Sequence, residues 1–166
     1  MRTPEKLNDR SVSLLLSLLQ SEFKAFYFYR AAENWCKNAG FNKAAAYFAK
    51  ESITELDHAK SIEAYLVDWN VNPTLPGIES PQTNFINLVD IIERAYNLEF
   101  GLFGDYTSAS DDVFSRKDLA TFAVIQSKVQ TQVDSVKEYS DMLNVLQGVD
   151  IRDKFQLLMI EENLFG

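Results

Sequence analysis

The sequence predicts an all-α protein: a four-helix bundle with a long crossover between its second and third helices, followed by a short fifth helix. Only 6 Gly and 4 Pro interrupt the 166 residues, so long helices can form. Apolar residues recur in alternating steps of three and four, the spacing of a helix face buried in a bundle. Three of the prolines fall within residues 70–81, which we therefore interpret as a long ordered connection. With 46% hydrophobic residues, we expect a single domain over residues 1–166.

Each predicted helix is bounded by residues that begin or end helices. Asn8 and the serines that follow it can cap the first helix, and Gly40 ends it. The polar cluster Ser110-Asp111-Asp112 is expected to end the third helix. The fifth is expected to bury a stripe that includes Phe155 and Leu158. The predicted helices span residues 11–38, 42–69, 84–109, 115–147 and 150–163.

Charge and composition exclude several kinds of partner. A net charge of −8 argues against binding to nucleic acid and fits the attraction of cations. The sequence has no apolar run long enough to span a membrane and no apolar segment typical of a signal peptide near its start. The single cysteine, Cys36, excludes an intrachain disulfide and is expected to be a buried apolar residue. We therefore expect a cytoplasmic protein.

Polar residues interrupt the apolar face of every long helix near its middle. They are Glu22 in the first helix, Glu55 and His58 in the second, Glu99 in the third and Gln132 in the fourth. A carboxylate buried without a partner costs several kcal/mol, so something must compensate for these groups. Glu55 and His58, the only histidine, are three residues apart and can reach one metal ion from the same helix face.

Residue counts place these groups near one height in the bundle. Glu22 precedes the turn at Gly40 by about 18 residues, and the second helix's pair follows that turn by about 15 and 18, which matches within one helical turn. In the second hairpin, Glu99 lies about 13 residues before Asp112 and Gln132 about 20 after it. Their expected heights along the bundle axis therefore differ by about 10 Å. The crossover makes the second and third helices parallel, so both hairpins can contribute to one site.

Three carboxylates, one imidazole and one amide form an oxygen-rich set of ligands. Such a set suits divalent iron or manganese, with zinc as a competitor. Glu55 can bridge two ions, and each ion can then give one electron to dioxygen or peroxide. The alternative is a buried polar network without metal, but these helix faces carry no Lys or Arg to balance the carboxylates.

With these residues the chain resembles the non-haem ferritins of bacteria, from about Leu14 to Gln147. The resemblance implies a ferritin-like bundle and a ferroxidase that oxidises Fe(II) with O2 or H2O2. It also implies storage of Fe(III) as mineral in a homo-oligomeric cage of twenty-four subunits. The most specific matching segments are Glu22-x6-Tyr29-x5-Trp35-Cys36, Glu55-x-x-His58, Tyr96-x-x-Glu99, and Asp118-x-x-Thr121-Phe122 leading to Gln132.

The resemblance assigns roles to individual residues. Tyr29 is implied to lie beside the di-iron centre as an electron donor. The implied ligands are Glu22, Glu55 and His58 for the first iron and Glu55, Glu99 and Gln132 for the second.

Some positions depart from the family pattern. Residues 132–135 read Gln-Val-Asp-Ser where bacterioferritins carry a second Glu-x-x-His, and Ser135 replaces a glutamate common in bacterial ferritins. The second iron should therefore be held more weakly. Thr54 and Thr131 occupy positions of acids that hold a third iron, which leaves Asp134 as a remnant of that site. The second helix has no methionine at the haem-ligand position, so haem is not expected.

Two further acids lie on the second helix. Glu51, one turn before Glu55, is either a transit ligand or a residue of the cage interior, and Asp57 is expected to line the inner surface, where it could help mineral to nucleate. Phe122 and Ile125 stand where animal ferritins place an acidic pair at three-fold pores, so iron is expected to enter by another route.

Three alternative classes stay open. A small di-iron carboxylate oxidase acting on an organic substrate would need an apolar access cavity. A DNA-protecting mini-ferritin usually builds its metal site between subunits and lacks a fifth helix. A helical interaction protein would leave the buried polar layer unexplained.

Overall fold

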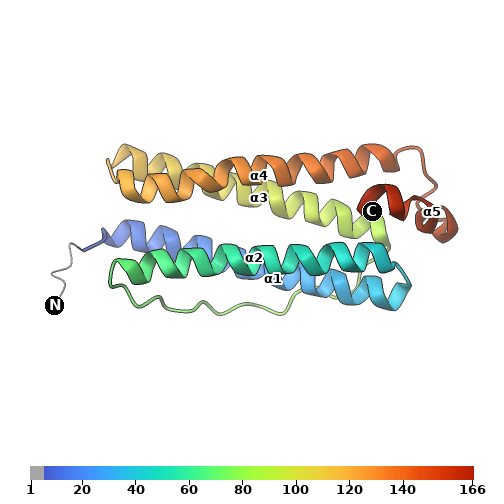
Figure 1. Cartoon of the computed structure of the whole chain (residues 1–166), viewed down its shortest axis with the longest axis horizontal. Coiled ribbons are helices and arrows are strands. Elements are labelled where there is room, and N and C mark those ends of the chain that lie inside the picture. The colour runs from blue at the N-terminus through green and yellow to red at the C-terminus, as the bar shows by residue number, and fades with distance from the viewer. Residues whose placement is uncertain (1–5) are drawn as a thin grey trace.

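The computed structural model describes residues 6–166, which form five helices and no strand. The helices are α1 (Asp9–Ala39), α2 (Asn42–Asp68), α3 (Leu88–Ser115), α4 (Leu119–Leu146) and α5 (Lys154–Phe165). Two antiparallel hairpins, α1 with α2 and α3 with α4, lie side by side, and the crossover that connects α2 to α3 runs the length of the bundle along the outer side of the first hairpin (Figure 1). The predicted all-α bundle is thus confirmed. Over the same residues, no helix is both long and apolar enough to cross a membrane.

The local signals that bound the first hairpin act as predicted. The side chain of Asn8 caps α1 by accepting a 2.9 Å hydrogen bond from the backbone N–H of Arg10. Gly40 ends α1 with a φ of +85°, in the left-handed region where glycine carries no steric penalty. The crossover is fastened to α1 by the side chain of Gln20, which donates a 3.2 Å hydrogen bond to the carbonyl of Gly77.

The third helix differs from the prediction at both ends. It begins at Leu88, because the side chain of Asn87 caps it by accepting a hydrogen bond from the N–H of Asp90. It also continues through the cluster 110–112, which was predicted to end it. Asp112 is held there by Arg10 of α1 at 2.6 Å and by Arg116 at 2.7 Å. These tertiary contacts satisfy a polar side chain that would otherwise favour a turn.

The longer third helix moves the second turn to residues 116–118 and removes the predicted mismatch in height. Relative to Lys117, Glu99 lies about 18 residues before the turn and Gln132 about 15 after it. Glu22 and Glu55 have the same spacing about Gly40. The two hairpins therefore bring their polar residues to the same level.

The fifth helix buries a different stripe from the one predicted. Leu157 and Leu164 face the bundle, whereas Phe155 and Leu158 are 69% and 39% exposed. The reason is a contact that the sequence pattern does not show: the buried carboxylate of Glu161 accepts a 3.3 Å hydrogen bond from a backbone N–H in the first turn of α2. This capping contact fixes which face of α5 turns inward.

The apolar core has two parts that flank mid-height. One part, which includes Phe48 and Ile92, lies toward the α1–α2 turn, where α5 covers the bundle. The other, which includes Leu19 and Leu66, fills the opposite half. Cys36 is buried in the first part, as predicted. Most of the predicted site residues lie between these two parts.

Candidate metal centre

Two groups of ligands meet at mid-height and share one carboxylate. Ligand atoms of Glu22, Glu55 and His58 lie within 4.8 Å of one another, and so do those of Glu51, Glu55 and Glu99. We call these the first and the second group. Helices α1, α2 and α3 contribute to them, and the residues Glu22, Glu55 and Glu99 are at most 2% exposed. Glu55 lies where two metal ions could share a bridging ligand.

In the first group, His58 Nδ1 lies 3.1 Å from Glu55 Oε2 and 3.7 Å from Glu22 Oε2. Glu22 Oε1 accepts a hydrogen bond from the Tyr106 hydroxyl, whereas Glu22 Oε2 is buried without a hydrogen-bond partner. An unpaired buried acceptor costs about 1–3 kcal/mol. A divalent cation would pair with this oxygen, so the donor set fits a hard metal ion such as Fe(II).

In the second group, neutral donors hold Glu99 from two sides. Its Oε1 accepts a 2.5 Å hydrogen bond from the hydroxyl of Tyr29, and its Oε2 accepts one of 2.8 Å from the amide of Gln132. Tyr29 thus lies beside the cluster, and Gln132 meets the second group through Glu99. Glu51, partly buried on α2, completes this group.

Burial and the neighbouring charges raise the pKa of three of the four carboxylates, Glu51, Glu55 and Glu99. Burial, followed by the charges and hydrogen bonds of Glu22 and Glu99, holds the pKa of Glu55 well above its usual range. Burial also raises the pKa of Glu99, against the hydrogen bonds from its two neutral donors. Burial and then the charges of Glu138 and Glu99 raise the pKa of Glu51 to about 7. For Glu22 the neighbours in the first group outweigh burial and lower the pKa. No lysine or arginine of residues 6–166 forms an ion pair with these four acids, so a cation would relieve the repulsion.

Two predicted positions lie outside the cluster, and one contact was missed. Asp134 is exposed, accepts a hydrogen bond from Gln130 and belongs to neither group. Asp57 is also exposed. The missed contact is that of Tyr106, whose hydroxyl donates a hydrogen bond to Glu22. Tyr106 lies two helical turns after Glu99 on the same face of α3, and this spacing could have indicated that it points toward the cluster.

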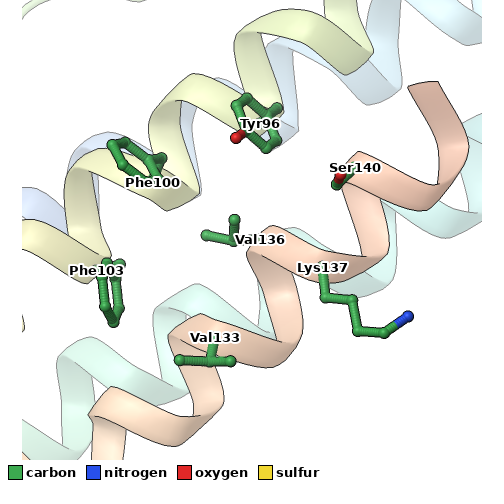
Figure 2. Close-up of a pocket in the computed structure, with 7 residues that line it drawn as sticks. All are labelled: Tyr96, Phe100, Phe103, Val133, Val136, Lys137 and Ser140. Carbon is green, nitrogen blue, oxygen red and sulfur yellow. The ribbon is translucent and has the colours of Figure 1, made fainter. Parts of the chain in front are cut away.

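A separate apolar groove of about 350 Å³ lies on the surface between α3 and α4 (Figure 2). Its walls are three aromatic residues of α3 and the facing residues of α4. None of the metal-group residues lines it. The lining residues are Tyr96, Phe100, Phe103, Val133, Val136, Lys137 and Ser140.

The fold and the site together define a class of protein: a four-helix bundle that buries carboxylates and one histidine around a shared glutamate, as in dimetal carboxylate proteins. Residues 12–149 match the model of the ferritin family, described as a ferritin-like domain. The chain belongs to this family.

Known ferritins share both its sequence pattern and its shape. The chain is 27% identical over 126 residues to a bacterial non-heme ferritin of Campylobacter jejuni, covering 76% of this chain and 75% of that protein. It is 25% identical over 158 residues to a probable bacterial non-heme ferritin-like protein of Haemophilus influenzae, covering 95% of each. Its fold is similar to an open pore ferritin of Archaeoglobus fulgidus, with a TM-score of 0.89 at 20% identity over 95% of this chain and 96% of that one.

Proposed function

We propose that the protein stores and detoxifies iron by oxidising Fe(II) to Fe(III) at the two ligand groups. The observation that supports this most strongly is that both groups share Glu55 and are otherwise separate. One ion would be held by Glu22, Glu55 and His58, and the other by Glu51, Glu55 and Glu99. The names of the similar proteins, non-heme ferritins, point to the same metal.

The charge of the cluster explains both binding and release. Four carboxylates balance the charge of two Fe(II) ions, so the pair can be held in a largely buried site. After each ion has given one electron to O2 or H2O2, two Fe(III) ions exceed that charge by two. The excess favours hydrolysis to oxide and transfer out of the site. Iron is thus the substrate of the reaction, and the product is stored as mineral.

The surrounding residues hold the ligands in place. The Tyr106 hydroxyl directs one oxygen of Glu22 away from the site and leaves its unpaired oxygen facing the first group. The Tyr29 hydroxyl and the Gln132 amide hold Glu99 in place, with one donor on each of its two oxygens. All these groups are on helices, whose rigid backbone keeps the ligand positions fixed between turnovers.

We also propose that the protein is a single ferritin-like domain that assembles in the cytoplasm into a closed homo-oligomer, the cage of twenty-four subunits implied by the resemblance. Phe155, Leu158 and Met159 form an exposed apolar surface on the short helix α5. Such a surface is costly unless a neighbouring subunit covers it. A light-scattering mass of a monomer or dimer at micromolar concentration would contradict the cage.

The test of function uses stopped-flow absorbance after anaerobic loading with Fe(II) and mixing with oxygenated buffer. The Glu99→Gln variant should lose the fast oxidation phase. The Glu93→Gln variant is the matched control, because Glu93 is an exposed acid on the same helix and should react like the wild type. Anomalous diffraction of crystals soaked in Fe(II) without oxygen should show metal beside Glu55 and His58. A soaked crystal without metal there would end this proposal.

A further inference from the structure

A line of oxygen groups continues along α2 beyond the second ligand group. Glu55, Glu51 and Tyr47 follow one another at intervals of four residues, so each lies about 6 Å further along one face of the helix. Glu55 is shared by the first and the second group, and Glu51 is the last member of the second. Glu51 is thus placed to be shared with a third position, one helical turn nearer to the α1–α2 turn.

Helix α4 brings Glu138 and Tyr139 to this third position. The ring of Tyr139 meets that of Tyr47 edge to face, with centroids 6.2 Å apart and planes at 90°. Burial and then the charges of Glu51 and Glu138 raise the pKa of the Tyr47 hydroxyl. Two carboxylates and two phenols, one of each from α2 and one of each from α4, therefore converge on one place.

The two hydroxyl groups at this place have no hydrogen-bond partner. Those of Tyr139 and Tyr47 are buried and unpaired among residues 6–166, and the whole of Tyr139 is buried. An unpaired buried hydroxyl destabilises a protein, and phenylalanine would fill the same space without that cost. Oxygen lone pairs left free beside two carboxylates suit a cation or the water molecules bound to it.

Glu138 is free to act as a ligand and lies at the surface. It is exposed and forms no ion pair with a lysine or arginine of residues 6–166, whereas Asp141, one turn further along α4, is held by Lys137 at 2.5 Å. Glu138 and Asp141 line a cavity of about 200 Å³ between α4 and α5, to which Asn163 contributes an amide. The third position therefore connects the buried cluster with this cavity.

We propose that Glu51, Glu138 and the two tyrosine hydroxyls form a third cation site, which takes product iron from the second group and passes it toward the cavity between α4 and α5. This inference rests on the proposed function. The site offers only oxygen donors and two carboxylates, so it suits a hard cation of high charge. Because Glu51 is shared, an ion can move by exchanging one ligand at a time.

Charge favours movement in this direction. The four carboxylates of the cluster carry two charges too few for two Fe(III) ions, and Glu138 supplies a fifth carboxylate next to the second group. When one ion moves to Glu51 and Glu138, the other keeps three carboxylates and is balanced. The ion that moves retains one excess charge, which hydrolysis by the water of the cavity removes. The third site thus separates the two product ions.

Crystals soaked in Tb(III) test the site itself. Tb(III) is a hard trivalent cation that prefers oxygen ligands, undergoes no redox chemistry here and is located by its anomalous scattering. The wild type should show Tb(III) beside Glu55 and a further peak between Glu51 and Glu138. Glu138→Gln should lose the further peak and keep the one beside Glu55. Asp134→Asn is the matched control and should keep both peaks, because Asp134 is an exposed acid of α4 that belongs to neither ligand group.

Two successive additions of Fe(II) in oxygenated buffer test the transfer. The rate of the fast oxidation phase is measured for a first addition that fills the cluster and for an equal second addition after the first has reacted. In the wild type the two rates should be similar, because the product has left the cluster. In Glu138→Gln the second rate should fall about tenfold below the first, since losing one supporting group commonly weakens a metal site by that factor or more. Asp134→Asn should keep the wild-type ratio.

The outcomes separate this inference from the function on which it rests. Tb(III) beside Glu55 without a peak between Glu51 and Glu138 would refute the third site, and so would a further peak that survives in Glu138→Gln or is lost in Asp134→Asn. A wild-type ratio of rates in Glu138→Gln would refute the transfer. Each of these results leaves iron oxidation at the cluster intact. Absence of the fast phase from the first addition to the wild type would instead refute the proposed function.

Discussion

Replacing Glu51 by glutamine should make the metal-free protein more stable above neutral pH and reduce its stabilisation by divalent metal. Glu51 is partly buried near Glu99 and Glu138, and these surroundings raise its pKa from the ordinary 4.5 to about 7. The folded protein therefore binds a proton at Glu51 more tightly than the unfolded chain does. The stability that this proton contributes is fully present below pH 4.5 and is lost as the pH rises through 7.

The size of the effect follows from the shift. One pKa unit corresponds to about 1.4 kcal/mol, so the rise from 4.5 to about 7 makes ionising Glu51 in the folded protein cost at most about 3.5 kcal/mol, and its partial exposure lowers this figure. Glutamine stays neutral at every pH and avoids the cost. For a chain of this length, about 2–4 °C per kcal/mol converts it to an increase in Tm of up to about 10 °C at pH 8.5. At pH 5 the difference should be small.

Calorimetric scans with a chelator at the two pH values measure the first part of the prediction. Scans with Zn(II), which does not undergo redox chemistry, measure the second part, because a cation stabilises the anionic form of Glu51 and raises Tm through binding. Wild type should gain more Tm from Zn(II) than Glu51→Gln. Glu63→Gln, a change of a partly buried acid elsewhere on α2, is the control and should alter neither result. An equal increase in Tm at pH 5 and pH 8.5, or an unchanged response to Zn(II), would show that Glu51 is not part of the cluster.

Three other substitutions test the contacts around the site and α5. Tyr106→Phe removes the hydrogen bond to Glu22, so it should destabilise the protein by about 2 kcal/mol in thermal scans and weaken binding of the first Fe(II) in anaerobic titrations. Glu161→Ala leaves the backbone N–H of Ala44 without its partner and should cost about 1 kcal/mol; faster proteolysis between α4 and α5 would check that α5 detaches. Ser135→Glu adds a carboxylate on α4 and should tighten binding of the second Fe(II) in the same titrations, and an unchanged affinity would place residue 135 outside the site.

Helical periodicity predicted the fold and the inward-facing acids because both depend on one repeating geometry. A residue such as Glu22 or Glu99 on an apolar face must point into the bundle, whichever partners it finds there. The end of α3 was not predictable in this way. Asp112 favours a turn by its local preference, and contacts with Arg116 and with Arg10, about a hundred residues earlier in the chain, keep it within a helix.

The membership of the second group also depended on packing that periodicity does not describe. Glu51 was expected near Glu55 on α2, but its approach to Glu99 is set by the distance and rotation between α2 and α3. The contact between Tyr47 and Tyr139 was likewise not predictable from periodicity. Tyr139 lies on the apolar face of α4, whereas Tyr47 precedes the core residue Phe48 on α2. The two rings meet only because the helices pack together.

The position of the acids at mid-height links stability to function. The two parts of the core, around Leu19 and Leu66 on one side and Phe48 and Ile92 on the other, stabilise the two halves of the bundle. Between them the helices cannot separate to let the carboxylates relax, so the metal-free protein retains a repulsion that only cations or protons relieve. Neutral replacements such as glutamine should then stabilise the metal-free protein while they weaken iron oxidation. Because the crowding that destabilises the empty site also provides its affinity for cations, these acids are explained by function and not by stability.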